Sequence, residues 1–218
     1  MKRLFSFATL LFSIIAMHAQ QPETGSIVLR PMVGATFGFF GVSETYEMSG
    51  VTIYSIDSKI KPGFTAGAEA GYQVAKWFQP SIGLFYSQQG SKIKQQWFGV
   101  DKAIDYKFKA NYLTIPLMAN FYVARGLALK IGLQPGFLLS AKNCAPDVND
   151  DCKDDCRSFQ FQIPVGISYE YRNIVVDARA AIPCTKTLKK TDASTTSVYT
   201  EAQNTLFQLT FGYNFRLL

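Results

Sequence analysis

The side chains best suited to chemistry lie in one polar stretch near position 150. Cys144, Cys152 and Cys156 fall within the sequence CAPDVNDDCKDDC, and Cys184 follows at the end of a later apolar stretch. Cysteines of exported proteins meet oxidising conditions, so we expect up to two disulfides, with a connectivity that spacing does not determine. The alternative is an all-thiolate metal site, which is unusual outside the cell.

The same stretch is acidic, with Asp147, Asp150, Asp151, Asp154 and Asp155. Asp147, Asn149 and Asp151 occupy the first three ligand positions of a calcium-binding loop. Cys152 stands where that loop requires Gly, and Ser158 stands where it requires Glu, so an EF-hand is excluded. Nonspecific calcium binding stays open, but a solvated acidic loop is the favoured interpretation.

Histidine is almost absent, because the single His18 lies close to the amino terminus. Because His18 falls in the leader expected to be removed, the mature chain would have no histidine, which excludes His-dependent catalytic triads and most zinc sites. The net charge of +6 comes from scattered Lys and Arg residues, with no basic helix or nucleic-acid motif. We therefore expect no catalytic residues, no cofactor, no metal and no nucleic-acid partner.

Many lysines gather in or beside the long polar stretches of the chain. They could contact phosphates of outer-leaflet lipid, or they could be solvated loop charges, which is the favoured interpretation. They are Lys59, Lys61, Lys92, Lys94, Lys102, Lys107, Lys109, Lys186, Lys189 and Lys190.

The amino terminus has the layout of a secretory signal peptide. Lys2 and Arg3 precede an apolar run, and Ala19 offers a small residue for cleavage near positions 19–20. The expected organisation is a signal peptide over 1–19, a short segment over 20–29 and one domain over 30–218. The apolar run is too short to span a bilayer comfortably as a mature helix.

The rest of the chain alternates apolar and polar residues with the period of β-strands. The pattern is clearest over 159–171 and 205–217, where aromatic and aliphatic residues alternate with Gln, Gly, Ser and Thr. Further strands are expected near 31–42, 62–73, 78–93, 113–121, 127–137 and 174–182. Prolines at 116, 135, 164 and 183 fall inside these stretches and remove donors, which indicates bulges or strand ends.

Short and long connections alternate strictly along the chain. Short ones are expected at 75–77, 125–126 and 172–173, and long polar ones at 43–61, 94–105, 141–157 and 185–202. This sorting is typical of outer-membrane barrels, which have short periplasmic turns and longer extracellular loops. We therefore predict an all-β, eight-stranded antiparallel up-and-down transmembrane barrel with four long extracellular loops. Aromatic residues beside the short turns suit a periplasmic girdle, namely Trp77, Phe78, Tyr122, Tyr169 and Tyr171.

The bulk of the apolar face indicates which way the strands point. Eight strands enclose an interior that side chains just fill, so rows of large aromatics must face outward, toward lipid. The inward face then carries a polar network in the lumen, consisting of Glu69, Lys130, Glu170, Asp177, Arg179 and Arg216. Three acids and three bases in a narrow lumen should pair as a plug, with an ion pathway as the alternative.

Three segments carry a resemblance to a known family. They are Tyr112–Tyr122 (YLTIPLMANFY), Leu129–Leu139 (LKIGLQPGFLL) and Ile163–Tyr169 (IPVGISY). The chain resembles the Bacteroidetes outer-membrane β-barrel family of PorT-like proteins over about residues 30–218. The resemblance implies an integral outer-membrane barrel and says almost nothing of activity.

The leading functional hypothesis is a non-enzymatic outer-membrane barrel with a structural, surface-interaction or envelope-assembly role. A narrow porin or small-solute channel is the first alternative, and a secreted soluble β-sandwich that binds a ligand is the second. The expected partners are outer-membrane lipid and other envelope or surface proteins that meet the long loops. The barrel is expected to be a monomer.

Overall fold

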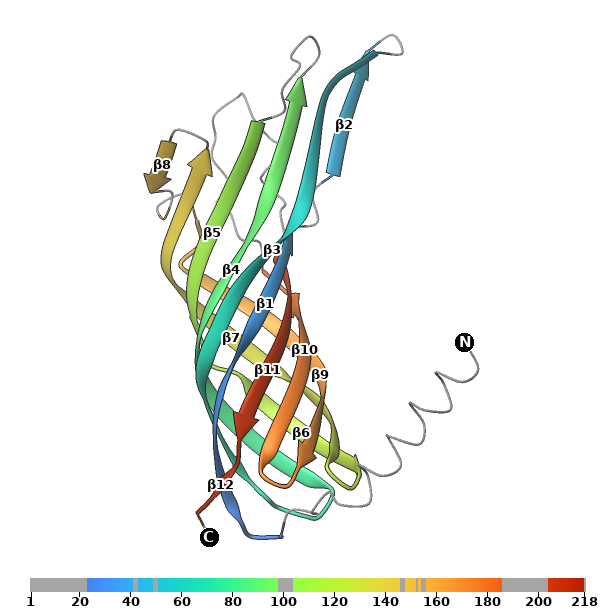
Figure 1. The fold of residues 1–218 in the computed structure, drawn as a ribbon, viewed down its shortest axis with the longest axis vertical. Helices are drawn as coiled ribbons and strands as arrows, with labels where there is room; N and C mark the ends of the chain where they lie inside the picture. Colours follow the sequence, from blue (N-terminus) through green and yellow to red (C-terminus); the bar gives the residue numbers. More distant parts are fainter. Residues whose placement is uncertain are drawn as a thin grey trace, which may run out of the picture.

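Figure 1 shows a computed structural model of the protein, in which neighbouring strands pair antiparallel. The structure describes residues 23–40, 43–48, 51–97, 104–145, 148–151, 153, 156–185 and 204–217. The strands are β1 (Ile27–Phe40), β2 (Ser43–Met48), β3 (Val51–Tyr72), β4 (Phe78–Trp97), β5 (Ile104–Thr114), β6 (Leu117–Ala124), β7 (Leu127–Ala145), β8 (Val148–Asp151), β9 (Phe159–Tyr171), β10 (Ile174–Pro183), β11 (Asn204–Tyr213) and β12 (Phe215–Arg216). The expected signal peptide over 1–19 lies outside the described residues.

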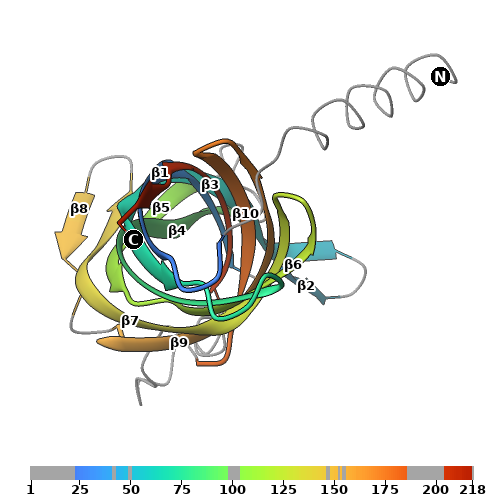
Figure 2. The ribbon, with the colours of Figure 1, turned by 90° about the horizontal axis from the view of Figure 1, so that it is seen from below.

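The sheet closes on itself through β1. Gly34 of β1 faces Thr65 of β3 on one side and Thr210 of β11 on the other. Since β5 and β6 form one interrupted strand, as do β11 and β12, the ring holds eight strands, each beside its neighbours in sequence. Figure 2 shows the ring from below. The predicted eight-stranded up-and-down barrel is confirmed, and β1 begins at Ile27, inside the segment 20–29.

Proline explains one interruption of the ring. Pro116 lies between β5 and β6 and has no N–H to donate, but its carbonyl accepts a hydrogen bond of 2.8 Å from Gly83 N. Ile115 N donates to Pro135 O at 2.9 Å, so both neighbouring strands stay attached across the break. Two other prolines of the predicted strands leave the strands continuous. Pro164 lies within β9, and Pro183 is the last residue of β10.

The predicted short turns lie together at one end of the barrel. They are residues 73–77 between β3 and β4, Arg125–Gly126 between β6 and β7, and Arg172–Asn173 between β9 and β10. Arg172 and Gly126 adopt left-handed conformations, with φ of 57° and 72°, which tight hairpin turns require. The carboxyl end returns to this same end of the barrel, where Leu217 N donates to Ile27 O at 2.9 Å.

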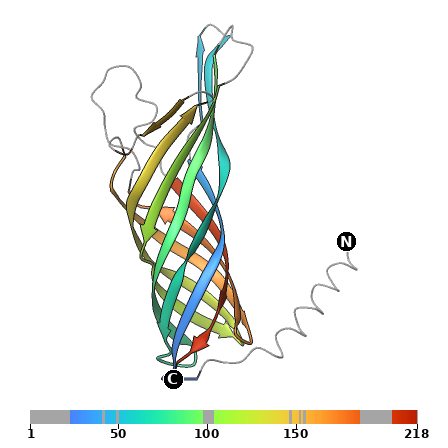
Figure 3. The same ribbon diagram turned by 60° about the vertical axis from the view of Figure 1, so that its left-hand side comes forward.

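The opposite end is uneven, because some strands are about twice as long as others. β3, β4 and β7 have 22, 20 and 19 residues, whereas β10 and β11 have 10 each. Figures 1 and 3 show these long strands and β5 rising past the ends of β1, β10 and β11. β2 pairs with β3 and β8 pairs with β7, so the raised wall is widened on both sides.

We call this raised wall the sheet extension; it comprises β2, β8 and residues 51–60, 88–97, 104–111 and 139–145. The prediction that 43–61 and the ends of 94–105 and 141–157 are loops is therefore wrong. These segments are strands in which polar residues interrupt the apolar alternation of the membrane strands, most of all over 88–97, QQGSKIKQQW. Residues 186–203, most of the last expected loop, lie outside the described part.

The outer face of the barrel is apolar and the inner face is polar. Along β7, Leu129, Ile131 and Leu133 are 48–49% exposed, whereas the alternating Lys130 and Gln134 are 3% and 2% exposed. This is the inverse of a water-soluble protein and matches a barrel whose outer solvent is lipid. A soluble β-sandwich, which would bury its apolar face, is thereby excluded. In the described residues, no helix has the length and hydropathy to cross a bilayer.

Aromatic side chains gather near both rims of the apolar face. At the turn end, the Trp77 ring stacks on that of Phe121 at 6.3 Å and lies 5.5 Å from that of Phe78. Toward the other end, Phe64 pairs with Tyr86 and Phe137 with Phe159, at ring distances of 5.4 and 5.7 Å. Two such belts are the expected anchors at the two membrane interfaces.

The prediction that Tyr122 belongs to the aromatic girdle on the outer face is wrong. Tyr122 points into the lumen, where its hydroxyl donates to Gln79 Oε1 at 3.4 Å. Its strand neighbour Phe121 takes the outer position, because β6 alternates and Asn120 is already inward. Tyr171 is exposed on the outer face, and Tyr169 lies beside it on the same face, partly covered.

The lumen as candidate functional site

The lumen holds a cluster of ion pairs that four strands supply. Arg30 comes from β1, Glu69 from β3 and Lys130 from β7, while β10 contributes both Asp177 and Arg179. All five alternate with outward-facing residues in their strands, so the barrel's closure turns them toward its axis. Each is at most 6% exposed, and together they fill the lumen nearer the turn end.

Glu69 is the centre of the cluster. Its Oε1 accepts from Arg30 Nη1 at 3.1 Å and from Lys130 Nζ at 3.3 Å. Its Oε2 accepts from Arg179 Nη2 at 2.6 Å. The hydroxyl of Ser81 adds a further hydrogen bond to Oε1 at 3.1 Å. One carboxylate thus neutralises parts of three cations.

Asp177 completes the cluster from β10. Its Oδ2 accepts from Lys130 Nζ at 2.7 Å, and its Oδ1 accepts from Arg179 Nε at 2.6 Å. Arg30 Nε in turn donates to Asn214 Oδ1 at 2.5 Å. Charges buried this deeply are tolerated only when paired and hydrogen-bonded, and each member here meets that condition.

The six lumen residues expected from sequence fall into two groups. Glu69, Lys130, Asp177 and Arg179 meet in the cluster, whereas Glu170 pairs separately with Arg216 at 3.0 Å. The side chain of Arg216 is 30% exposed, so this pair lies where solvent reaches.

Sequence reasoning missed Arg30. The first strand was expected to begin near residue 31, and the alternation of Val28, Arg30 and Met32 with Ile27, Leu29 and Pro31 was the signal that could have found it. Val28, Arg30 and Met32 are all buried in the lumen.

Uncharged polar side chains pack above and below the cluster. Gln79 Nε2 donates to Gln73 Oε1 at 2.9 Å, and Asn120 Nδ2 donates to Gln79 O at 2.7 Å. Further along the axis, Gln134 Nε2 donates to Gln162 Oε1 at 3.0 Å. These bonds join neighbouring strands, so the polar filling also braces the barrel wall.

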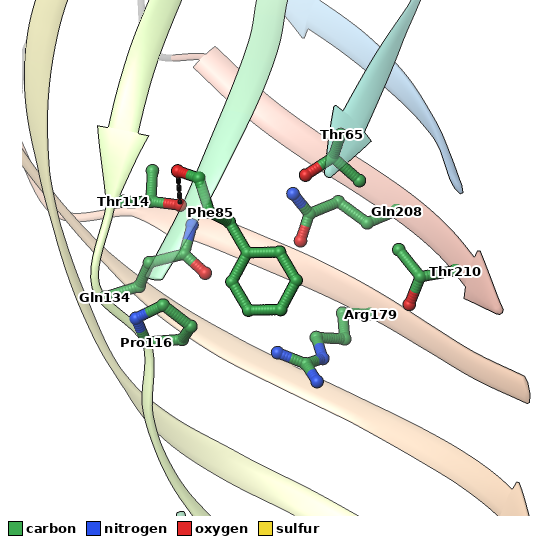
Figure 4. Close-up of a pocket in the computed structure, with 8 residues that line it drawn as sticks. All are labelled: Thr65, Phe85, Thr114, Pro116, Gln134, Arg179, Gln208 and Thr210. Atoms are coloured by element: carbon green, nitrogen blue, oxygen red, sulfur yellow. Dashed lines mark hydrogen bonds between the residues drawn. The ribbon is translucent and has the colours of Figure 1, made fainter. Parts of the chain in front are cut away.

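A small cavity remains midway along the lumen, with room for about one water molecule. Figure 4 shows the ring of Phe85 at its centre, facing Arg179. The Arg179 guanidinium carbon lies 5.9 Å from the centre of that ring. The lining residues are Thr65, Phe85, Thr114, Pro116, Gln134, Arg179, Gln208 and Thr210. A cavity of this size does not form a passage for solutes.

Apolar side chains form a buried cluster on one side of the lumen, at the end next to the sheet extension, where Gln89 and Ser91 are buried as well. Phe108, Tyr112, Leu138 and Ala141 are buried there, and Cys156 from the segment before β9 packs against them. The carbonyl of Ser158 in the same segment accepts a 2.8 Å hydrogen bond from Leu138 N. The lumen is thus filled by charged side chains toward the turn end and by uncharged ones, apolar and polar, toward the extension.

This architecture agrees with comparisons to known proteins. Residues 18–189 match the family model described as outer membrane protein beta-barrel domain. The chain belongs to this family. It is an integral protein of the outer membrane, as the apolar outer face requires.

Solved structures of similar fold include other outer-membrane barrels at low sequence identity. The chain is 16% identical to Ail, the attachment invasion locus protein of Yersinia pestis, with a TM-score of 0.46 and coverage of 88% of this chain and 100% of Ail. It is 12% identical to Neisserial surface protein A, with a TM-score of 0.49 and coverage of 87% and 97%. It is 12% identical to OprG from Pseudomonas aeruginosa, with a TM-score of 0.44 and coverage of 90% and 99%. No curated protein matches the chain.

The cysteines of this outer-membrane barrel do not meet the expectation of two disulfides. Cys184 is exposed and carries a free thiol, so the part of the prediction that pairs it is not supported. Cys184 directly follows β10, one of the short strands, at the end of the barrel opposite the turns, whereas Cys156 is buried. Cys152 lies outside the described residues, and only the backbone of Cys144 is described, as part of β7.

The acidic stretch is only partly described. Asp150 and Asp151 belong to β8, and Asp151 Oδ1 accepts from Lys153 N at 3.0 Å. Asp147, Asp154 and Asp155 lie outside the described residues. Within the described part, no group of three or more His, Cys, Asp or Glu residues could hold a metal ion.

Proposed function

We propose that this chain is a non-enzymatic, non-conducting barrel that anchors the sheet extension at the cell surface, in a structural, surface-interaction or envelope-assembly role. The observation that carries the proposal is the filled lumen. Five charged side chains cross-link four strands inside it, and uncharged side chains are buried toward the end next to the extension.

The energetics of the lumen argue against a solute path. An ion passing Glu69 would have to displace at least one of its three cationic partners. Removing one partner from a buried pair costs about 3–5 kcal/mol. Phe85 would also have to leave its place in the middle of the lumen, where it is 5% exposed. A resting pore therefore does not fit this interior, and the narrow porin alternative is not favoured.

The sheet extension is the part of the barrel that is free to meet other molecules. β2 and β8 pair only on one side among the described strands, so each presents a strand edge beyond the closed part of the barrel. Open edges are templates for pairing with another strand, and long ones are rare unless protected. Envelope or surface proteins that add a strand here are the partners we propose, with the barrel itself a monomer.

The absence of enzymatic activity is supported by the chemistry of the sequence. The single His18 lies in the proposed signal peptide, so the exported chain would have no imidazole to act as a general base. We further propose export through the leader 1–19, with cleavage near 19–20, and kinship to the PorT-like proteins of Bacteroidetes on the strength of the three sequence segments.

Conductance across a planar lipid bilayer tests the closed lumen. Purified full-length barrel should give no steady channels under conditions in which an open porin conducts. Reproducible channels of uniform size from the unaltered protein would refute the proposal.

Capture of partners from native membranes tests the role of the extension. The chain is tagged, isolated from its own membrane after cross-linking, and compared with a variant in which a two-residue Asn-Gly turn replaces residues 43–56. That variant keeps the β1–β3 register, which, when continued to the new turn, places position 42 opposite Asp57. A matched variant carries Lys76→Gln in a turn at the other end. Loss of a captured protein in the first variant alone is the expected result, and equal capture by both would refute a role for this edge.

A further inference from the structure

Five lysines stand opposite one another in register on four neighbouring strands, β3, β4, β5 and β7. Lys92 of β4 faces Lys59 of β3 on one side and Lys107 of β5 on the other. One step nearer the barrel, Lys109 of β5 faces Lys142 of β7. We call these five residues the lysine cluster. All five are exposed.

The alternation of β5 shows which face carries the cluster. Phe108, Ala110 and Tyr112 are buried on the inner side, so Lys107 and Lys109 lie on the outer side. The pairing of β4 with β5 is unbroken from Phe85 to Gln95, so Lys92 shares this outer face. The cluster therefore continues the lipid-facing surface of the barrel upward.

Lysines in this register repel one another. Like charges directly opposite in a sheet destabilise it, and none of the five has an ion-pair partner within the part of the chain that is described. Asp151 of β8 stands opposite Lys142, which it relieves in part. The next row is balanced within the sheet, because Lys94 stands between Asp57 and Asp105 in register. The excess positive charge is thus confined to the two rows nearest the barrel.

The height of these rows matches the headgroup layer. Tyr86, Leu113 and Phe137 form one cross-strand row on the outer face, at the level of the upper aromatic belt. A row of Gln88, Asn111 and Ser140 follows, in which Asn111 Nδ2 donates to Ser140 Oγ at 2.8 Å. Lys109 comes next, roughly 13 Å along the strand from Leu113. The order from lipid outward is therefore aromatic, neutral polar, cationic.

We propose that the lysine cluster binds phosphate groups of anionic glycolipid in the outer leaflet. Lysine ammonium groups act as point charges for phosphate and accept several arrangements of it. Phosphates held between the rows would neutralise Lys92, Lys107 and Lys109 together, while the acyl chains of the same lipid lie against the aromatic belt below. The inference rests on the membrane location of the barrel and is independent of whether the lumen conducts.

Lipid retention by the purified full-length barrel tests the inference. The protein is placed in phosphatidylcholine nanodiscs, without or with diphosphorylated lipid A, and in a third sample with lipid A whose phosphates have been removed. Retained lipid is counted by native mass spectrometry, and the shift in thermal unfolding temperature is measured. Binding and a higher unfolding temperature are expected with the phosphorylated lipid only.

Substitution of three central lysines provides the matched comparison. Each basic residue near an anionic surface contributes about 1 kcal/mol, so K92Q/K107Q/K109Q should weaken lipid A binding by at least tenfold. K92R/K107R/K109R, which keeps the charge, should bind like the unaltered protein. K76Q/R125Q, which removes two exposed charges at the turn end, should also bind normally.

Two outcomes would overturn the inference. One is equal retention of phosphorylated and phosphate-free lipid A by the unaltered barrel, a result that does not depend on any variant folding. The other is normal lipid A binding by the folded Gln variant. Conductance records stay the same in either case, so failure here is distinguishable from failure of the proposed closed lumen.

Discussion

Replacing Glu69 by Gln tests the ion-pair cluster most directly. The substitution keeps the size of the side chain and removes one charge from a residue that is 1% exposed. Three cations would then share the single carboxylate of Asp177, and Arg30 would lose its only ion-pair partner in the described residues. Breaking a buried pair on one side costs about 3–5 kcal/mol, because the remaining charge is left without compensation. We expect E69Q to lower the free energy of unfolding by about that amount.

The second carboxylate pair of the lumen supplies the control. Glu170 pairs with one cation, Arg216, whose side chain is 30% exposed, so water can solvate the charge that E170Q leaves behind. Pairs that solvent reaches contribute about 0–1 kcal/mol. E170Q should therefore cost several kcal/mol less than E69Q, although both remove one acidic group from the same barrel.

Unfolding by guanidinium chloride in lipid vesicles, followed by tryptophan fluorescence, measures the difference. A second check is E69Q combined with K130M, which removes one of the three cations left with the single carboxylate of Asp177 and should recover part of the lost stability, since an apolar replacement of a buried pair is often near neutral. Equal costs for E69Q and E170Q would show that the cluster is not the stabilising feature that its geometry indicates.

Three further predictions follow from other parts of the barrel. Phe85→Ala should cost about 3–5 kcal/mol in unfolding free energy, because it enlarges the small cavity around a ring that is 5% exposed; an unchanged unfolding midpoint would contradict this. Ile131→Lys, on the lipid-facing side of β7, should cost about 2–4 kcal/mol in vesicles, whereas Lys142→Ile in the extension should cost much less; similar costs would refute the proposed height of the membrane. In intact cells, a maleimide that cannot cross the membrane should label Cys184, which is exposed, and leave Cys156, which is buried, unreacted. Mass spectrometry of each single-cysteine variant measures the labelling, and labelling of Cys156 but not of Cys184 would contradict this prediction.

The membrane-crossing part of the barrel could be predicted from sequence because lipid imposes a strict pattern there. In β9, every second residue from Phe159 to Tyr171 must be apolar or aromatic, and the other half must fit a narrow polar lumen. Tight turns such as Arg172–Asn173 were visible for the same reason, since the alternation stops and resumes around them. The lumen carboxylates Glu69 and Asp177 could be chosen because they alternate with apolar residues and so fall on the polar, inward face of their strands.

The sheet extension could not be predicted in this way. Residues 51–60, VTIYSIDSKI, lie beyond the part of β3 that pairs with β1, and their Thr, Ser, Asp and Lys residues resemble those of a loop. Their strand state depends on pairing with β2 and β4, which is a tertiary effect. The lysine cluster was missed for the same reason: the lysines were visible one by one, but only the register of β3, β4, β5 and β7 places them side by side.

The two groups of charge in this barrel are neutralised in different ways, and this has a physical consequence. In the lumen, Glu69 and Asp177 are buried between Arg30, Lys130 and Arg179, so added salt barely screens them. In the lysine cluster the charges face the headgroup layer, where screening acts over about 8 Å at physiological ionic strength. Salt should therefore leave the barrel's core intact while it loosens the contact between extension and membrane. The stability of the fold and its attachment to anionic lipid are thus set by separate charges, on opposite faces of one sheet.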